Sequence, residues 1–331
     1  MPRPPALSTT TKGLSDRVFA VLLPRIQAHR GTLHALHVGD TYLDPPEVAF
    51  SERVTMADHP RMHSYAPPQG LPELLDAIQD RLRTRFHTEV PAEAIQVTLG
   101  ATGGINVACH ALLDPGDEVL LPSPFWPLIR GIIQARGAVP VQIPLYTRLG
   151  DADFDVEASL EAAVTPKTTA IYLNSPNNPT GAILSEDDLA AVARVAERHN
   201  LWVLTDEVYE ELTFGDTPPP CAWSRLDLAH RTIATHSLSK AYGLAGARLG
   251  YIHGPTEVMR TIRGLQTFMT YCAAKPMQYA GARALRGSEA ERGGGRAQPF
   301  ELALARVAIR QVIVQPGLLF GGGLPVDVCR Q

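Results

Sequence analysis

The sequence predicts an α/β fold, with a mostly parallel central sheet, helices on both of its faces, and an additional small α/β domain. From residue 95 onward, short runs of β-branched and aliphatic residues alternate with amphipathic helical segments. Strands that alternate with helices pair in parallel through right-handed crossovers, which covers both faces of one sheet. Polar motifs follow several expected strands, and ligands of such sheets bind at the carboxyl ends of the strands.

The composition indicates a globular protein with a large core. The chain has 331 residues, of which 45% are hydrophobic, enough for one large domain and a smaller one. A net charge of −4 without a basic run gives no indication of a nucleic-acid partner. The four cysteines lack metal-ligand spacing, so no metal site is expected. Short apolar runs and an N-terminus without a secretory pattern favour a cytoplasmic protein without a membrane span.

The expected elements follow from hydrophobic periodicity and from turn signals. Strands are expected at residues 33–38, 95–99, 118–121, 139–143, 169–173, 201–205, 232–235 and 249–252. Helices are expected at residues 14–30, 71–86, 104–113, 125–135, 156–163, 185–199 and 258–284, the last interrupted near Pro276. A glycine run is expected to break the pattern over residues 287–299.

Lys240 lies in a glycine-rich segment that is poor in other charges. Ser237 and Ser239 precede it, and Arg248 follows. Desolvation and a neighbouring cation both lower a lysine pKa, which suits an unprotonated nucleophile near an anion. A simple connection between two core strands with one surface lysine explains this stretch alone equally well.

Other candidate residues follow the expected strands. Asp206 ends a very apolar strand, where a carboxylate is costly unless it is paired with a cation such as a protonated ring nitrogen. Tyr209 can donate a phenolic hydrogen bond on the same side. The amide of Asn178 can donate to a ring oxygen or can simply form an Asn-Pro turn. Trp126 can stack on a planar ligand, although core packing is the commoner role.

The glycine-rich turn at residues 100–104 opens a helix. Free backbone N–H groups and a hydroxyl make such a turn a natural phosphate site, although many glycine-rich turns have no ligand. Each candidate therefore has a purely structural explanation. All of them together, with Lys240 and Arg248, are hard to explain by core packing.

The whole set resembles the class I/II (fold-type I) pyridoxal-phosphate-dependent aminotransferases. The resemblance covers roughly residues 14–286. Its most specific motifs run from Asn174 to Gly181, from Asp206 to Tyr209, and from Ser237 to Arg248. It implies pyridoxal 5'-phosphate as the cofactor and amino acids and 2-oxo acids as substrates.

The resemblance also implies a role for each matched residue. Lys240 would form the internal aldimine and later act as general base. Asp206 would keep the pyridine nitrogen protonated, while Asn178 and Tyr209 would hydrogen-bond the ring oxygen and Trp126 would stack on the ring. The phosphate would be held by Ala101, Thr102, Gly103, Ser237, Ser239 and Arg248.

Two further implied roles concern the partner subunit and the substrate. Tyr65 would reach a phosphate in the neighbouring subunit, which implies a homodimer with shared active sites. Gly39 and Asn178 would contact the substrate. Arg330 lies about where the family's carboxylate-binding arginine is expected, because residues 312–321 resemble a late family segment.

The C-terminal part departs from the family pattern. Residues 287–299 stand where helices and a hairpin are expected, so the small domain is predicted to be incomplete. The expected division is an N-terminal arm and part of the small domain at 1–40, a large cofactor-binding domain at 41–270, and a partial small domain at 271–331. Alternatively, residues after about 287 are unrelated sequence.

Three functions are compatible with these motifs. The first is transamination between an L-amino acid and a 2-oxo acid. The second is β-elimination by a C–S lyase on the same scaffold, which differs only in the fate of the carbanion. The third is a truncated homologue that binds the cofactor with little activity.

Overall fold

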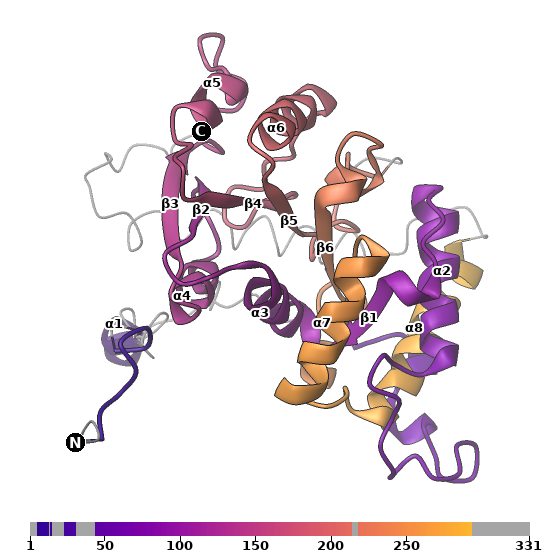
Figure 1. Cartoon of the computed structure of the whole chain (residues 1–331). Helices are drawn as coiled ribbons and strands as arrows, with labels where there is room; N and C mark the ends of the chain where they lie inside the picture. Colours follow the sequence, from indigo (N-terminus) through magenta and orange to yellow (C-terminus); the bar gives the residue numbers. More distant parts are fainter. Residues whose placement is uncertain (1–4, 13, 15–22, 31–43, 214–217, 293–331) are drawn as a thin grey trace.

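The computed structural model describes residues 5–12, 14, 23–30, 44–213 and 218–292. A seven-stranded sheet lies at its centre, in the order β1-β7-β6-β5-β4-β2-β3 (Figure 1). The strands are β1 (Ile95–Thr98), β2 (Glu118–Ser123), β3 (Val139–Pro144), β4 (Thr168–Asn174), β5 (Trp202–Asp206), β6 (Thr232–Ser237) and β7 (Gly250–His253). Strands β2 to β6 run parallel, whereas β7 is antiparallel to both β1 and β6. The mostly parallel α/β sheet predicted from the sequence is confirmed.

Helices cover both faces of this sheet (Figure 1). The α-helices of the described residues are α1 (Leu23–Ala28), α2 (Pro72–Phe86), α3 (Gly100–Leu112), α4 (Pro127–Ala135), α5 (Val156–Glu161), α6 (Glu186–Arg198), α7 (Thr256–Met269) and α8 (Lys275–Arg292). Neighbouring residues of one strand enter different cores, as the two-residue period of a strand requires. In β2, Leu120 packs with the α5 and α6 side, whereas Val119 and Leu121 pack with α3, α4 and α7.

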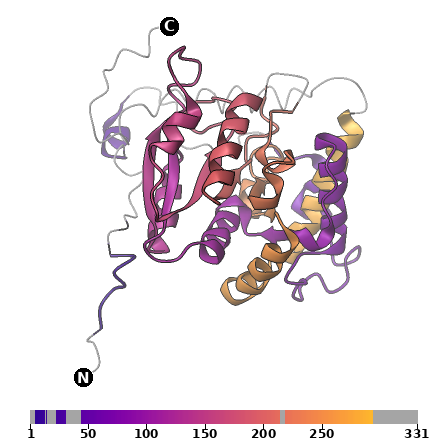
Figure 2. The same ribbon diagram turned by 45° about the horizontal axis from the view of Figure 1, so that its top comes forward.

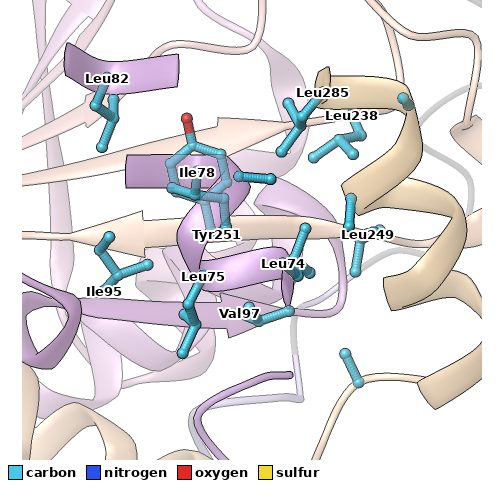
Figure 3. Packing of buried hydrophobic residues seen from close by; sticks show 14 of the residues in the cluster. Leu74, Leu75, Ile78, Leu82, Ile95, Val97, Leu238, Leu249, Tyr251 and Leu285 are labelled. Atoms are coloured by element: carbon cyan, nitrogen blue, oxygen red, sulfur yellow. The ribbon is translucent and has the colours of Figure 1, made fainter. Parts of the chain in front are cut away.

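A third core lies between α2, α8 and the β1–β7 end of the sheet. Figure 2 shows the two helices side by side, and Figure 3 shows the side chains that they bury. Ile78 and Leu82 of α2 are fully buried in the cluster that also contains Ile95, Tyr251 and Leu285. This packing attaches α8 to the large sheet.

Local sequence signals account for several helix ends. Pro72 occupies the first turn of α2, where its missing N–H costs no hydrogen bond. Ser185 and Asp188 form a reciprocal capping box at the start of α6. The expected interruption near Pro276 corresponds to residues 270–274, which separate α7 from α8.

The predicted break at Gly287 is wrong, because α8 continues to Arg292. One glycine costs a helix only about 1 kcal/mol relative to alanine, and packing against α2 outweighs that cost. A Cβ at Gly287 would lie 2.8 Å from Val48 Cγ2, so close approach of the chain at Val48 explains the glycine. The glycines of residues 100–104 are likewise part of α3 and do not precede it.

Several expectations fall on other parts of the chain. The expected strand at 33–38 and the segment 293–331 lie outside the described residues, and only residues 23–28 of the expected first helix are described as helical. The proposed division into domains therefore stays a prediction. Among the described helices, none is both long and apolar enough to cross a bilayer.

Candidate active site

The site is built around Asp206, the last residue of β5. Parallel pairing aligns Asp206 with Asn174 at the end of β4 and with Thr235 on β6. The Tyr172 hydroxyl donates to Asp206 Oδ2 at 2.9 Å, and the Val208 N–H donates to Oδ1 at 3.3 Å. Burial raises the pKa of Asp206 from 3.8 to about 6, although both hydrogen bonds oppose that rise. No basic side chain of the described residues pairs with this carboxylate.

An amide–phenol pair lies beside Asp206. Asn178 Nδ2 donates to the Tyr209 hydroxyl oxygen at 3.0 Å, and the Asn178 backbone N–H donates to Asn174 Oδ1 at 2.7 Å. Asn174 Nδ2 in turn donates to the Asp206 carbonyl oxygen at 2.9 Å. Burial, with a contribution from the Asp206 charge, raises the pKa of Tyr209 to about 12. The phenol therefore keeps its proton at neutral pH and can donate it to a ligand.

The glycine-rich N-terminus of α3 faces Arg248. Gly100 has a φ of +68°, and a Cβ built on it would lie 2.7 Å from Arg248 Nη2. Arg248 Nη1 lies 3.5 Å from Ser239 Oγ and donates to the Ala245 carbonyl oxygen at 2.9 Å. The Ser239 N–H donates to Ser237 Oγ at 3.1 Å. A helix N-terminus, two hydroxyls and a guanidinium are the kinds of donor that bind a phosphate.

Arg248 itself has a left-handed backbone, with a φ of +49°. This conformation is uncommon outside glycine and costs roughly 1 kcal/mol. Gly250 lets β7 approach the first turn of α3, because its Cβ would lie 2.8 Å from the carbonyl carbon of Gly100. The close packing of β7 on α3 thus brings Arg248 to the helix N-terminus.

The remaining candidates lie around this centre or outside it. Lys240 is half-buried in the segment after β6, between Ser239 and Tyr242. Trp126 precedes α4 and packs, partly buried, against the core on the α3 side of the sheet. Ala101 is buried, whereas Thr102 and Gly103 are half-buried in the first turn of α3.

Of the three remaining candidates, only Tyr65 belongs to the described part of the chain. Tyr65 is 79% exposed and lies against Tyr271, with a ring-centroid distance of 4.9 Å. Gly39 and Arg330 lie outside the described residues. The roles assigned to all these residues stay predictions.

Two residues of the site were not among the sequence candidates. The Tyr172 hydroxyl donates to the Asp206 carboxylate, and the Asn174 side-chain amide donates to the Asp206 backbone carbonyl. They are two residues apart on β4, so they share one face of the strand. A polar pair on one face of an apolar strand end was the signal that could have identified them.

A protein-family model matches most of the chain. The family model described as "Aminotransferase class I and II" matches residues 33–306. The chain belongs to this aminotransferase family. Gly39 lies inside the matched range and Arg330 lies beyond it.

Curated relatives and solved structures agree with this membership. An aspartate aminotransferase of Streptomyces avermitilis is 35% identical, over 70% of this chain and 57% of that protein. A probable aspartate/prephenate aminotransferase of Thermus aquaticus is 34% identical, over 84% of this chain and 70% of that protein. The aspartate aminotransferase structure from Rhizobium meliloti has a TM-score of 0.79 at 28% identity, covering 91% of this chain and 74% of that one. The chain thus spans little more than half the length of the first of these relatives.

Membership of the family implies pyridoxal 5'-phosphate as the cofactor, and the residues present fit that group. The buried Asp206 carboxylate lacks a cation among the described residues, and a protonated pyridine nitrogen is such a cation. Arg248, two serines and the α3 N-terminus match a phosphate. An amide and a phenol stand near Asp206 for the polar ring substituent.

The raised pKa predicts how Asp206→Asn changes the cofactor-free protein. A carboxyl whose pKa is higher in the folded state stabilises that state fully below about pH 4, and this contribution is lost as the pH rises to about 6. Asparagine stays neutral throughout. At pH 7 we therefore expect the cofactor-free variant to be more stable than the parent by about 1–3 kcal/mol, and at pH 4 about equal to it.

Urea unfolding of both cofactor-free proteins across this pH range measures the difference. Asp227→Asn is the matched control, because Arg225 lowers the pKa of this half-exposed carboxyl. That control should lose stability at pH 7. Equal stability of Asp206→Asn and the parent at every pH would contradict the raised pKa.

Proposed function

We propose that this protein is a pyridoxal-phosphate-dependent aminotransferase that moves an amino group between an L-amino acid and a 2-oxo acid. The observation that carries this proposal is the buried Asp206 carboxylate, which pairs with no basic side chain of the described residues and lies beside the Asn178–Tyr209 pair. The family membership supports the same reaction. When bound, the cofactor supplies an electron sink for the electron pair left at the substrate Cα.

Asp206, Tyr209 and Asn178 would set the electronic state of the cofactor ring. An ionised Asp206 favours a proton on the ring nitrogen, because a buried negative charge stabilises a cation next to it. The Tyr209 oxygen already accepts from Asn178 Nδ2, so its own proton remains for donation to the ring oxygen. Tyr172 in turn fixes the orientation of the Asp206 carboxylate.

The α3 N-terminus and Arg248 would fix the position of the cofactor through its phosphate. Backbone N–H groups of Ala101 to Gly103 and the hydroxyls of Ser237 and Ser239 supply donors, and Arg248 supplies charge. These groups belong to α3, to the end of β6 and to the segment between β6 and β7, and α3 packs against both of these strands. A phosphate anchored by rigid elements leaves the ring one orientation.

Lys240 would carry the proton transfer. Its Nζ would hold the cofactor covalently in the resting protein, and once displaced by the substrate amine it would accept the Cα proton as a neutral base. The same Nζ would then give up that proton, so Lys240 would serve as both base and acid. Trp126 would cover one face of the ring, which keeps water from the reacting atoms.

The substrate side rests on residues outside the described part of the chain. Asn178 is the one proposed substrate contact with described geometry, and Gly39 and Arg330 complete the proposed set. A guanidinium such as that of Arg330 binds a carboxylate through two parallel hydrogen bonds and thereby orients the Cα bonds. Two of the relatives are named for aspartate, which makes L-aspartate the first amino donor to test.

The proposal predicts a two-stage spectral cycle for the cofactor-loaded protein. An L-amino acid that is a substrate should abolish the visible absorbance of the bound cofactor, with one amino acid converted per enzyme active site. A 2-oxo acid added afterwards should restore that absorbance. Screening the twenty amino acids by stopped-flow absorbance measures the first stage. Lys240→Ala should slow it by at least about 10³-fold, because general base and nucleophile are lost together.

Two other results would contradict transamination. Release of ammonia and pyruvate from a cysteine conjugate, without a 2-oxo acid acceptor, would indicate β-elimination. A stable visible band in the presence of every amino acid, with cofactor bound in a 1:1 ratio, would indicate a cofactor-binding homologue without turnover.

We also propose that two copies of the chain form a dimer with shared active sites. Tyr65 contacts Tyr271, and Tyr271 follows two more exposed apolar residues, Phe268 and Met269, at the end of α7. Phe268 is 91% exposed, which is unfavourable in a monomer in water. In the family pattern, Tyr65 reaches the partner's cofactor, so a second copy is the occupant that these exposed residues fit.

Phe268→Asp tests this proposal, with Leu226→Asp as the matched control. Leu226 is as exposed as Phe268 but lies between α6 and β6, away from the end of α7. Sedimentation velocity should show a dimer for the parent and the control, and a shift toward monomer of at least about tenfold in dissociation constant for Phe268→Asp. A monomeric parent, or an unchanged Phe268→Asp, would rule this surface out.

A further inference from the structure

A buried group of charged and aromatic residues lies outside the residues assigned to the cofactor. Arg81 of α2 is 2% exposed, and its guanidinium donates to four side chains. Arg81 Nη2 donates to Glu210 Oε1 at 2.7 Å and to Glu211 Oε1 at 2.6 Å. Arg81 Nε and Nη1 donate to the hydroxyls of Tyr242 and Tyr251, both at 3.0 Å. We call Arg81, Glu210, Glu211, His236, Tyr242 and Tyr251 the Arg81 cluster.

The cluster reaches β6 through Glu210. Glu210 Oε1 lies 3.0 Å from His236 Nδ1, and His236 Nε2 lies 3.0 Å from His253 Nε2 on β7. Burial lowers the pKa of His253 well below its usual value, so this ring is neutral. Burial alone would raise the pKa of Glu210, but the charge of Arg81 and the contact with His236 outweigh it and hold that pKa below its usual value. Glu210 is thus an ionised carboxylate between α2 and β6.

Glu211 makes contacts of a different kind. It binds Arg81 as Glu210 does, but its second ion pair is with Arg85, also on α2, at 3.3 Å. The ion pairs of Glu211 with Arg81 and Arg85 both involve α2, whereas those of Glu210 with Arg81 and His236 join α2 to β6. The two neighbouring glutamates provide a natural comparison.

The cluster joins the two segments that carry the proposed cofactor residues. Glu210 directly follows Tyr209 in the turn that begins at Asp206, and the Glu210 N–H closes that turn on the Glu207 carbonyl at 3.0 Å. Tyr242 lies two residues after Lys240, and His236 directly precedes Ser237. Arg81 therefore holds the Asp206 turn through Glu210 and the Lys240 segment through Tyr242.

Stability alone is a poor explanation for this arrangement. Replacing a buried ion pair by apolar residues of similar volume is often neutral or stabilising, because both charges lose their hydration. The surroundings here are apolar, with Leu238 and Leu285 packed in the same core. Hydrogen bonds with fixed directions, unlike apolar contacts, specify the relative position of the segments that they join.

We propose that Arg81, Glu210 and Tyr242 are positioning residues of the cofactor site, which set the placement of the Asp206 turn relative to the Lys240 segment. This inference rests on the proposed binding of pyridoxal phosphate. The three residues would act without contacting the cofactor, by holding in position the segments that carry its ligands, as the partners of ligand side chains do in metal sites.

Glu210→Gln and Glu211→Gln test the proposal in the full-length chain. Both variants remove one negative partner of Arg81, so both should lower the unfolding temperature. Only Glu210→Gln loosens the link to β6. We expect its dissociation constant for pyridoxal phosphate to rise by about tenfold, and that of Glu211→Gln to stay within about twofold of the parent. The visible circular dichroism of the bound cofactor, which reports its orientation, should change in Glu210→Gln alone.

If Glu210→Gln does not fold, a second pair of variants tests the positioning role. Tyr242→Phe and Tyr251→Phe each remove one hydroxyl that accepts from Arg81 at 3.0 Å. Tyr242→Phe should weaken cofactor binding and alter the circular dichroism, and Tyr251→Phe should do neither. Equal effects within both pairs, or no effect in either, would overturn the positioning role. A parent protein that binds no pyridoxal phosphate would instead overturn the proposed function.

Discussion

The burial of the Asp206 carboxylate at the end of β5 is the constraint on which the rest of the site depends. A negative charge in this position is unfavourable by itself, as its raised pKa shows. The chain provides a tyrosine hydroxyl and one backbone N–H for it, and no cation among the described residues. Such a carboxylate is explained by a ligand that brings a positive charge. The parallel register then decides which other groups can reach that ligand, because Asn174 and Thr235 are aligned with Asp206.

The surrounding elements follow from this position. Tyr172 and Asn174 of β4 donate to Asp206, and Asn178, in the loop that follows β4, donates to the Tyr209 hydroxyl. On the other side, β7 approaches α3 closely enough that a Cβ at position 250 would clash with the backbone of Gly100, and Gly100 itself has the positive φ that favours glycine. That approach brings Arg248 to the α3 N-terminus. In the proposed function, Asp206 would pair with the cationic ring nitrogen, and Arg248 with the α3 N-terminus would hold the phosphate.

Much of this could be predicted from the sequence, because periodicity and strand-end polarity are local signals. The alternation of strands and helices indicated the sheet, and Asp206 stood out as a carboxylate after a purely apolar run. The extent of α8 could not be predicted, since Gly287 signals a break unless the neighbouring Val48 is known. The sequence did not predict the Arg81 cluster, because its members are up to 170 residues apart in the chain. In the sequence, each of them alone is an ordinary polar residue. The antiparallel direction of β7 depends on a short connection that contains Lys240 and Arg248.

Reduction of the cofactor-loaded protein with borohydride, followed by peptide mapping, tests most directly whether these residues form one cofactor site. Borohydride fixes the bond between pyridoxal phosphate and the amine that holds it, so the labelled peptide identifies that amine. We predict a single stoichiometric label on Lys240, and no label in the Lys240→Ala variant. A label on another lysine, such as the Lys275 that contacts Ser64, or no label at all, would contradict the site described for this protein.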